Sequence, residues 1–488
     1  MRRAGILLHP TSLPGPYGSG DIGPAAREYL AWLEAAGQRI WQMLPLHPVD
    51  GLGSPYASPS AFAGNPMLLS VDDMVDEGWL RQVEKPYLAG ADRRFVYARV
   101  AEARAPALTL AAERVSSQVD LAAYRRTKRW LDDWCLYAAI ADDLGGDWLR
   151  WPQGLRDREP DAIAAARDRY GVAIDRHAAL QWLFDRQWSR LRREAKVRGV
   201  DLWGDLPYMV SHASADVWAN RELFQLDKDG EPIVISGVPP DAFSPEGQLW
   251  GHPQYDNAAH RATGWAWWCD RVESLIERVD AVRLDHFRGI AAAWHVQTGA
   301  PNALDGEWVE GPGAELLAAI RDRLGVVPII AEDLGVITPD VEALRDDFEL
   351  PGMAILEFAF GEHEDHAYLP HNHRKELVVY PGTHDNDTVV GWYQSAGERT
   401  RDHARRYLNA SGNDIAWDFI RAAYRSHADT AIIAMQDALA LDGGSRMNVP
   451  GQAEGNWGWR MGREAMNVAL AHHLRLQVSV SGRLEEIE

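Results

Sequence analysis

The chain has 488 residues, of which 46% are hydrophobic and 25% charged, and this is the composition of a globular protein with a core of ordinary size. Lys and Arg total 50 against 71 Asp and Glu, so the formal net charge is −21. Such acidity argues against sequence-independent binding to nucleic-acid phosphates and to anionic membranes.

Eight short apolar or β-branched runs predict strands, and helical patterns separate several of them. The predicted strands are residues 5–9, 39–44, 200–206, 281–285, 327–332, 354–358, 377–380 and 446–449. Pro24 can open a helix that Gly37 closes, and Thr338-Pro339 can open another. Strands that alternate with helices indicate an α/β protein with a parallel sheet, and eight such units predict a (β/α)₈ TIM barrel formed by a single domain, residues 1–488.

The interval between the second and third predicted strands is far longer than one crossover helix requires. Apolar residues at three- and four-residue spacing predict a helix over 121–144, and a second amphipathic pattern covers 177–198. We therefore expect residues 66–198 to form a mostly helical inserted subdomain. Residues 231–256 are rich in Pro, Gly and aromatic residues and are expected to form an ordered loop over the mouth of the barrel.

The chain contains only two cysteines, Cys135 and Cys269, which is too few for a Cys-rich metal site. No run approaches the ~20 apolar residues that span a bilayer, and the N-terminal apolar run is too short for a signal sequence. These features favour a reduced, soluble, cytoplasmic protein with no membrane partner.

Carboxylates follow four of the predicted strands, where the active sites of barrels lie. Arg283 and Asp285 alternate with Leu284, so both point to one side of their strand, and the guanidinium favours an ionised Asp285. Glu332 follows a strongly apolar strand, which favours a retained proton. One ionised and one protonated carboxyl are what glycoside cleavage with retention requires. The remaining polar residues at strand ends are Asp205, His384 and Asp385.

Two other interpretations fit individual residues. A single Asp after a strand is commonly a helix cap or a turn residue, and we assign Asp333, Asp340 and Asp387 to that role. Carboxylates at successive barrel strands also bind Mg²⁺ in some enzymes, but Arg283 places a cation at the same mouth. The 21 Trp residues, more numerous than the 15 Tyr or the 10 Phe, favour carbohydrate, because flat aromatic rings stack on sugars.

Motifs from one end of the chain to the other occur in the same order in one enzyme family. They include His9-Pro10-Thr11-Ser12-Leu13-Pro14, Gly204-Asp205-Leu206-Pro207, Arg283-Leu284-Asp285-His286-Phe287-Arg288-Gly289, Glu332-Asp333-Leu334-Gly335, Thr383-His384-Asp385-Asn386-Asp387 and Asn448-Val449-Pro450-Gly451. On these residues the chain resembles the 4-α-glucanotransferases called amylomaltases or disproportionating enzymes, which are relatives of the α-amylases. Two residues depart from the family pattern: His47 stands where Gly is frequent, and His252 where Asn is frequent.

The resemblance implies that a segment of an α-1,4-glucan is moved to the 4-hydroxyl of another glucan or of glucose through a covalent glucosyl-enzyme. It implies that Asp285 is the nucleophile, Glu332 the general acid/base and Asp385 the third carboxylate, which stabilises the transition state. The substrate-binding residues that it implies are Tyr56, Asp205, Gln248, Trp250, Arg283, His384, Asn456 and Trp457.

The expected partners are α-1,4-glucans and maltooligosaccharides, with glucose as acceptor, and neither nucleic acid nor a membrane. The chemistry needs no cofactor and no metal. The sequence leaves the oligomeric state open between a monomer and a weak dimer. It also leaves two alternatives: an α-1,4-glucan hydrolase of the α-amylase type, and a sugar-binding protein without catalytic activity.

Overall fold

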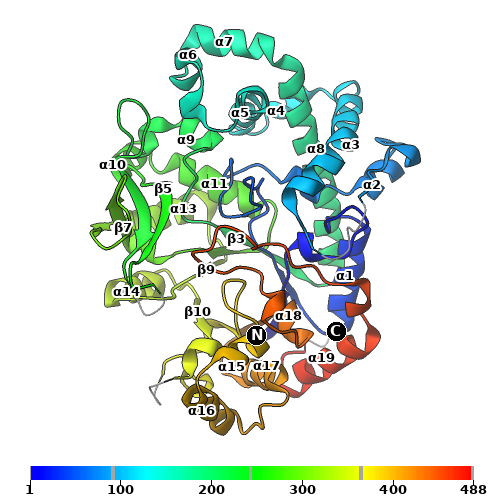
Figure 1. Ribbon diagram of the computed structural model, residues 1–488, viewed down its shortest axis with the longest axis vertical. Helices are drawn as coiled ribbons and strands as arrows, with labels where there is room; N and C mark the ends of the chain where they lie inside the picture. The colour runs from blue at the N-terminus through cyan, green and yellow to red at the C-terminus, as the bar shows by residue number, and fades with distance from the viewer. Residues whose placement is uncertain (1, 89–93, 241–243, 362–365, 485–488) are drawn as a thin grey trace.

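The computed structural model describes residues 2–88, 94–240, 244–361 and 366–484 (Figure 1). Eight parallel strands form one sheet that curls into a (β/α)₈ barrel, as predicted. In sheet order they are β10 (Gly352–Ile355), β11 (Leu377–Tyr380), β12 (Thr430–Ala434), β1 (Arg3–Leu7), β2 (Ile40–Gln42), β3 (Asp201–Leu206), β6 (Ala281–Leu284) and β9 (Ile329–Ala331).

Almost all residues of these strands are buried, because side chains fill the barrel and helices cover its outside. The first of these helices, α1 (Pro24–Ala35), begins at Pro24 as predicted and buries Tyr29, Leu30 and Leu33. The other helices that alternate with or follow barrel strands are α11 (Ala266–Ile276), α13 (Gly313–Leu324), α14 (Pro339–Asp347), α15 (Val389–Ser395), α16 (Glu398–Leu408), α17 (Ile415–Arg425) and α19 (Val468–Val480).

The prediction of the eighth strand at 446–449 is wrong. The eighth strand is β12, a five-residue run that is buried throughout and pairs with β1 and β11. Residues 446–449 lie outside both sheets and follow a 3₁₀ turn (Gly443–Ser445). They do not extend along the sheet because Arg446 and Asn448 form hydrogen bonds with Asp385 at the barrel mouth. The predicted strand 354–358 is also too long, since residues Leu356–Ala359 form the 3₁₀ helix η6.

Between β2 and β3 the described residues form helices. They are α2 (Val71–Asp76), α3 (Tyr97–Ser116), α4 (Leu121–Arg125), α5 (Leu131–Leu144), α6 (Gln153–Arg156), α7 (Pro160–Arg169) and α8 (Gly171–Val197). The single helix predicted over 121–144 is in fact two, and the helix predicted from 177 begins earlier, at Gly171. The long helix α8 packs against α1, α3 and α5 and so joins this region to the barrel.

A second, antiparallel sheet stands beside the barrel (Figure 1). Its order is β5 (Gln248–Pro253), β4 (Val234–Val238), β7 (Ala292–Gln297) and β8 (Glu307–Glu310). The stretch 231–256, predicted to be a loop, therefore contains the hairpin β4–β5; residues 241–243 of it lie outside the described residues. Four short helices complete the fold: α9 (Ala215–Ala219), α10 (Asn257–Ala262), α12 (Arg288–Ala291) and α18 (Met435–Ala438).

The two cysteines are buried and form no disulfide. Among the described residues, every helix is too short or too polar to cross a bilayer.

Candidate active site

The carboxyl ends of β3, β6, β9 and β11 bring together most of the polar residues that the sequence singled out. Asp205 and Arg283 are direct partners in the ladder between β3 and β6, so their side chains share one face. Asp285 follows β6, and Glu332 follows β9, the next strand of the sheet. The turn that carries His384 and Asp385 follows β11.

Arg283 lies between two carboxylates. Its Nη1 donates to both oxygens of Asp205, at 2.9 and 2.8 Å, and its Nη2 lies 2.9 Å from Oδ1 of Asp285. Burial lowers the pKa of Arg283, but the charges of Asp205 and Asp285 raise it well above its ordinary value. The guanidinium therefore stays charged, pairs with Oδ1 of Asp285, and leaves the other oxygen of Asp285 free of this contact.

Asp205 is 1% exposed and anchors a chain of hydrogen bonds across the mouth of the barrel. The Tyr56 hydroxyl donates to Oδ2 of Asp205 at 2.7 Å and lies 2.9 Å from Nε2 of His384. Because the single hydroxyl proton points to Asp205, Nε2 of His384 must be the donor in the second contact. The same nitrogen lies 3.2 Å from Oδ2 of Asp385, which orients this third carboxylate.

The loop of residues 446–449 supplies the remaining contacts of Asp385. Asn448 donates through Nδ2 to Oδ1 of Asp385 at 2.6 Å, and Arg446 donates through Nη2 to its backbone oxygen, also at 2.6 Å. Neither residue was predicted to belong to the site, because both were expected on a strand. The Asn448-Val449-Pro450-Gly451 motif was the signal that could have marked this loop as part of the site.

Glu332 has surroundings that favour the protonated form. Its Oε2 accepts the backbone N–H of His286 at 2.7 Å, and Oε1 accepts that of Leu334 at 3.2 Å. Burial raises its pKa to about 8, with a further rise from the charge of Asp285 and an opposing effect of Arg283. At neutral pH this group therefore holds a proton that it can donate.

His286, directly after Asp285, is a site residue that the analysis of strand ends did not select. Its backbone has a φ of +50°, a left-handed conformation that is costly for a side chain larger than glycine, and in this conformation its N–H reaches Glu332. Its ring meets that of Trp250 edge-on, with centroids 4.8 Å apart. Burial lowers the pKa of His286 to about 4, so the ring is neutral.

Aromatic rings cover the cleft from two directions. Trp250 extends from the hairpin β4–β5, and its indole N–H lies 3.4 Å from Oε1 of Gln248. On the other side, Trp457 packs against Tyr56 and His384, with ring centroids 5.7 and 6.1 Å apart. Trp457 also has a left-handed backbone, with a φ of +62°.

The side chains of Asn456 and Gln248 form hydrogen bonds within their own loop and hairpin. The Asn456 amide is engaged within its own loop: Oδ1 accepts the Val449 N–H at 3.0 Å, and Nδ2 donates to the Gln452 oxygen at 2.7 Å. This amide therefore shapes the loop that presents Trp457. The contact of Gln248 with Trp250 has the same effect on the opposite hairpin.

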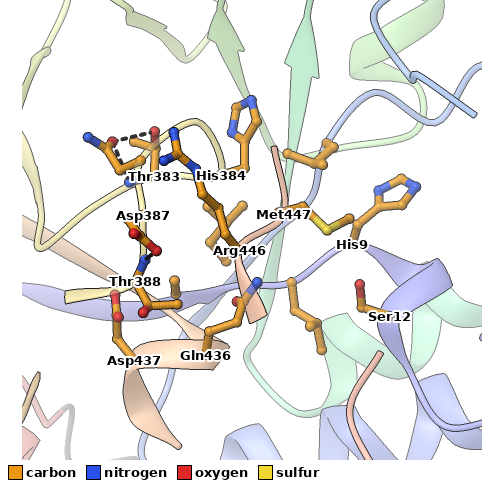
Figure 2. Close-up of a pocket in the computed structure, with 15 residues that line it drawn as sticks. His9, Ser12, Thr383, His384, Asp387, Thr388, Gln436, Asp437, Arg446 and Met447 are labelled. Carbon is orange, nitrogen blue, oxygen red and sulfur yellow. Dashed lines mark hydrogen bonds between the residues drawn. The ribbon is translucent and has the colours of Figure 1, made fainter. Parts of the chain in front are cut away.

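A small cavity of about 30 Å³ lies beside His384 (Figure 2). Polar groups from four segments line it, among them His9, Asp387, Asp437 and Arg446. Its volume is enough for a water molecule but not for a sugar ring. Among the described residues, no three His, Cys, Asp or Glu side chains are arranged to hold a metal ion, and the cation between Asp205 and Asp285 is Arg283.

Of the two family departures, His47 is buried and His252 is partly buried. His47 is 3% exposed, its Nδ1 lies 3.0 Å from the Ala63 oxygen, and burial lowers its pKa to about 3. Burial likewise lowers the pKa of His252, on β5, to about 4. Both rings are therefore neutral and add no charge to the cleft.

Comparisons with known proteins agree on one family. The family model described as 4-alpha-glucanotransferase matches residues 8–465. The 4-alpha-glucanotransferase of Thermus thermophilus is 42% identical over 496 residues, covering 99% of both chains, and a chloroplastic/amyloplastic one of Arabidopsis thaliana is 45% identical, covering 94% of this chain and 81% of the relative. The structure of an amylomaltase from Streptococcus agalactiae in complex with acarbose superposes with a TM-score of 0.96 at 34% identity, covering 99% of this chain and all of that one.

Proposed function

This chain belongs to the 4-alpha-glucanotransferase family, and we propose that Asp285, Glu332 and Asp385 carry out its reaction at the mouth of the barrel. The enzyme moves a segment of an α-1,4-glucan to the 4-hydroxyl of an acceptor by a retaining double displacement. The observation that carries the assignment is the difference between two neighbouring carboxyl groups: Asp285 is paired with Arg283, whereas burial keeps the proton on Glu332.

In the first displacement, an oxygen of Asp285 attacks the anomeric carbon, and the glycosidic bond breaks. Oδ1 is held by Arg283, so Oδ2 is the free oxygen that forms the new bond. Glu332 gives its proton to the departing glycosidic oxygen, which leaves as the hydroxyl of the shortened chain. The products are a glucosyl ester on Asp285 and an ionised Glu332.

In the second displacement, Glu332 takes the proton from the 4-hydroxyl of an acceptor, and the acceptor oxygen attacks the anomeric carbon. The ester bond to Asp285 breaks, and both carboxyl groups return to their starting charge. The free lone pairs of Asp385, whose oxygens are fixed by Asn448 and His384, accept hydroxyl hydrogens of the sugar at the cleaved bond. These hydrogen bonds strengthen as positive charge develops on the ring.

The substrates that we propose are maltooligosaccharides and longer α-1,4-glucans, with glucose as the smallest acceptor. The aromatic rings of Trp250 and Trp457 offer apolar faces for sugar stacking and restrict the access of water to the ester on Asp285. Transfer and hydrolysis share this ester and differ only in whether a sugar hydroxyl or water attacks it.

Incubation with maltotriose tests this function. Transfer yields glucose and longer chains while the total of reducing ends stays constant, whereas a steady rise of reducing ends would identify a hydrolase. We expect Asp285→Asn and Glu332→Gln to abolish turnover and to keep oligosaccharide binding, measured by calorimetry. A sugar-binding protein without catalytic activity would produce neither glucose nor longer chains, and turnover by Asp285→Asn would refute the choice of nucleophile.

A further inference from the structure

The turn that presents His384 and Asp385 is closed by the side chain of Asn386. Its Oδ1 accepts both the backbone N–H and the hydroxyl of Thr383, each at 2.9 Å. The Thr383 hydroxyl in turn accepts the backbone N–H of Asp385 at 3.3 Å. The orientation of the Asn386 amide therefore sets the shape of the turn and the direction of the Asp385 side chain.

Glu357 packs against Gly382, directly before this turn. It belongs to η6, directly after β10, is 4% exposed, and donates its backbone N–H to the Pro381 oxygen at 3.1 Å. A Cβ atom on Gly382 would lie 2.8 Å from Oε1 of Glu357 and 3.1 Å from Cβ of Asn386, so only glycine allows this approach. Gly382 thus brings the Glu357 carboxyl group and the Asn386 side chain together, and the Asn386 amide lowers the pKa of Glu357.

The charges around Glu357 oppose its ionisation. Burial raises its pKa well above the ordinary value, and the carboxylates of Asp437 and Asp387 raise it further, while Arg446 and the Asn386 hydrogen bond act in the opposite direction. Asp437, on α18, is 1% exposed, and burial raises its own pKa to about 7. Oε1 of Glu357 has no hydrogen-bond partner within the described part of the chain and is free to carry a proton.

We propose that Glu357 is a positioning residue which, in its neutral form, holds the Asn386 amide and thereby fixes His384 and Asp385 for the stabilisation of the transition state. Glu357 is expected to be neutral at this position, because an ionised Glu357 would add negative charge next to Asp387 and Asp437. The oxygen of the Asn386 amide is committed to Thr383, so its nitrogen is the group that can donate to Glu357. This proposal rests on the proposed role of Asp385.

Two substitutions at Glu357 test the contact. Glu357→Leu keeps the volume but removes the acceptor, and we expect kcat to fall about 100-fold with little change of KM, as when a group that acts in the transition state is misplaced. Glu357→Gln is neutral and retains an acceptor oxygen, and it should restore kcat to within about threefold of the wild type. Equal loss of kcat in both variants, or no loss in Glu357→Leu, would overturn the proposal.

The pH dependence of thermal unfolding tests whether Glu357 is protonated in the folded chain. The folded chain keeps a proton on Glu357 that the unfolded chain releases above its ordinary pKa, so the wild type loses stability relative to Glu357→Gln as the pH rises from about 4.5. The variant should therefore melt at a higher temperature than the wild type at pH 8, and the difference should vanish near pH 4. A difference independent of pH would contradict a protonated Glu357, and this measurement does not require Glu357→Leu to fold.

Two further variants distinguish a wrong role of Glu357 from a wrong role of Asp385. Asp21→Asn is the matched control: Asp21 is 6% exposed, burial raises its pKa to about 6, and it accepts the Gly23 N–H at the start of α1. We expect it to change the melting temperature and to leave kcat unchanged. Activity in Asp385→Asn would refute the proposed role of Asp385, whereas an inactive Asp385→Asn beside a fully active Glu357→Leu would refute only the role of Glu357.

Discussion

Asp285 and Glu332 follow neighbouring strands, yet different groups surround them. Arg283 contacts Asp285 directly at 2.9 Å, while Glu332 receives only backbone N–H groups. Burial then outweighs the more distant attraction of Arg283 and keeps the proton on Glu332. This difference between a direct ion pair and a buried carboxyl group is the physical basis of the roles that we propose for the two residues.

The raised pKa of Glu332 predicts a basic limit of activity. Donation of a proton requires the protonated form, so kcat/KM should be constant around neutral pH and fall above about pH 8, by about tenfold per pH unit. Because the charge of Asp285 raises this pKa, Asp285→Asn should lower it, as measured by carbon NMR with Glu332→Gln as the blank. A fall of kcat/KM that begins below pH 7, or an unchanged Glu332 pKa in Asp285→Asn, would contradict this account.

Individual side chains were predictable where a local pattern sets their direction. Alternation along β6 placed Arg283 and Asp285 on one face, and the apolar strand before Glu332 indicated its environment. Arg446 and Asn448 could not be predicted in this way, because they reach Asp385 from a segment 61 and 63 residues farther along the chain. The left-handed backbone of His286 also depends on the position of Glu332, which local sequence does not define.

Among the structural elements, periodicity predicted seven of the eight barrel strands and missed the last. Thr430–Ala434 is a short apolar run close behind the amphipathic helix α17, and only its position between β11 and β1 shows that it completes the sheet. The hairpin β4–β5 was missed for a related reason: its pairing partner β7 lies beyond β6 in the chain. Both errors concern pairings between distant segments.

The hairpin β4–β5 leads to a prediction about water. Trp250 packs edge-on against His286, which follows the proposed nucleophile Asp285 in the chain, whereas the neighbouring Leu249 is 37% exposed and alternates to the other face of β5. We expect Trp250→Ala to raise the ratio of hydrolysis to transfer about tenfold, which corresponds to about 1.4 kcal/mol between the two barriers. The measurement is the rise of reducing ends relative to glucose release from maltotriose.

Leu249→Ala is the control for the same strand and should leave that ratio unchanged. If both variants raised hydrolysis equally, a general loosening of the hairpin would explain the result. If neither raised it, water would be excluded by other residues, and Trp250 would act only in sugar binding.

At the scale of the whole molecule, the barrel has one seam without a strand ladder, between β9 and β10, which are the two ends of the sheet. The backbone closes it with a hydrogen bond from Ala331 to the Pro351 oxygen at 2.9 Å. The side chain of Asp333, which follows β9, links this strand to β10. Its Oδ1 accepts the Met353 N–H at 2.7 Å, and its Oδ2 pairs with Arg345 at 2.5 Å. The sequence predicted a cap or turn role for Asp333, and the structure shows instead a buried link across the seam.

This link predicts a large effect on stability. Asp333→Ala removes the acceptor of a buried N–H and leaves the largely buried Arg345 without its inner partner, so the free energy of unfolding should fall by about 3 kcal/mol. Asp340→Ala, an exposed change in the first turn of α14, should have little effect and serves as the control. Urea unfolding measures both. Equal stability of the two variants would mean that the backbone bond at Ala331 and the packing of β9 against β10 hold the seam without Asp333.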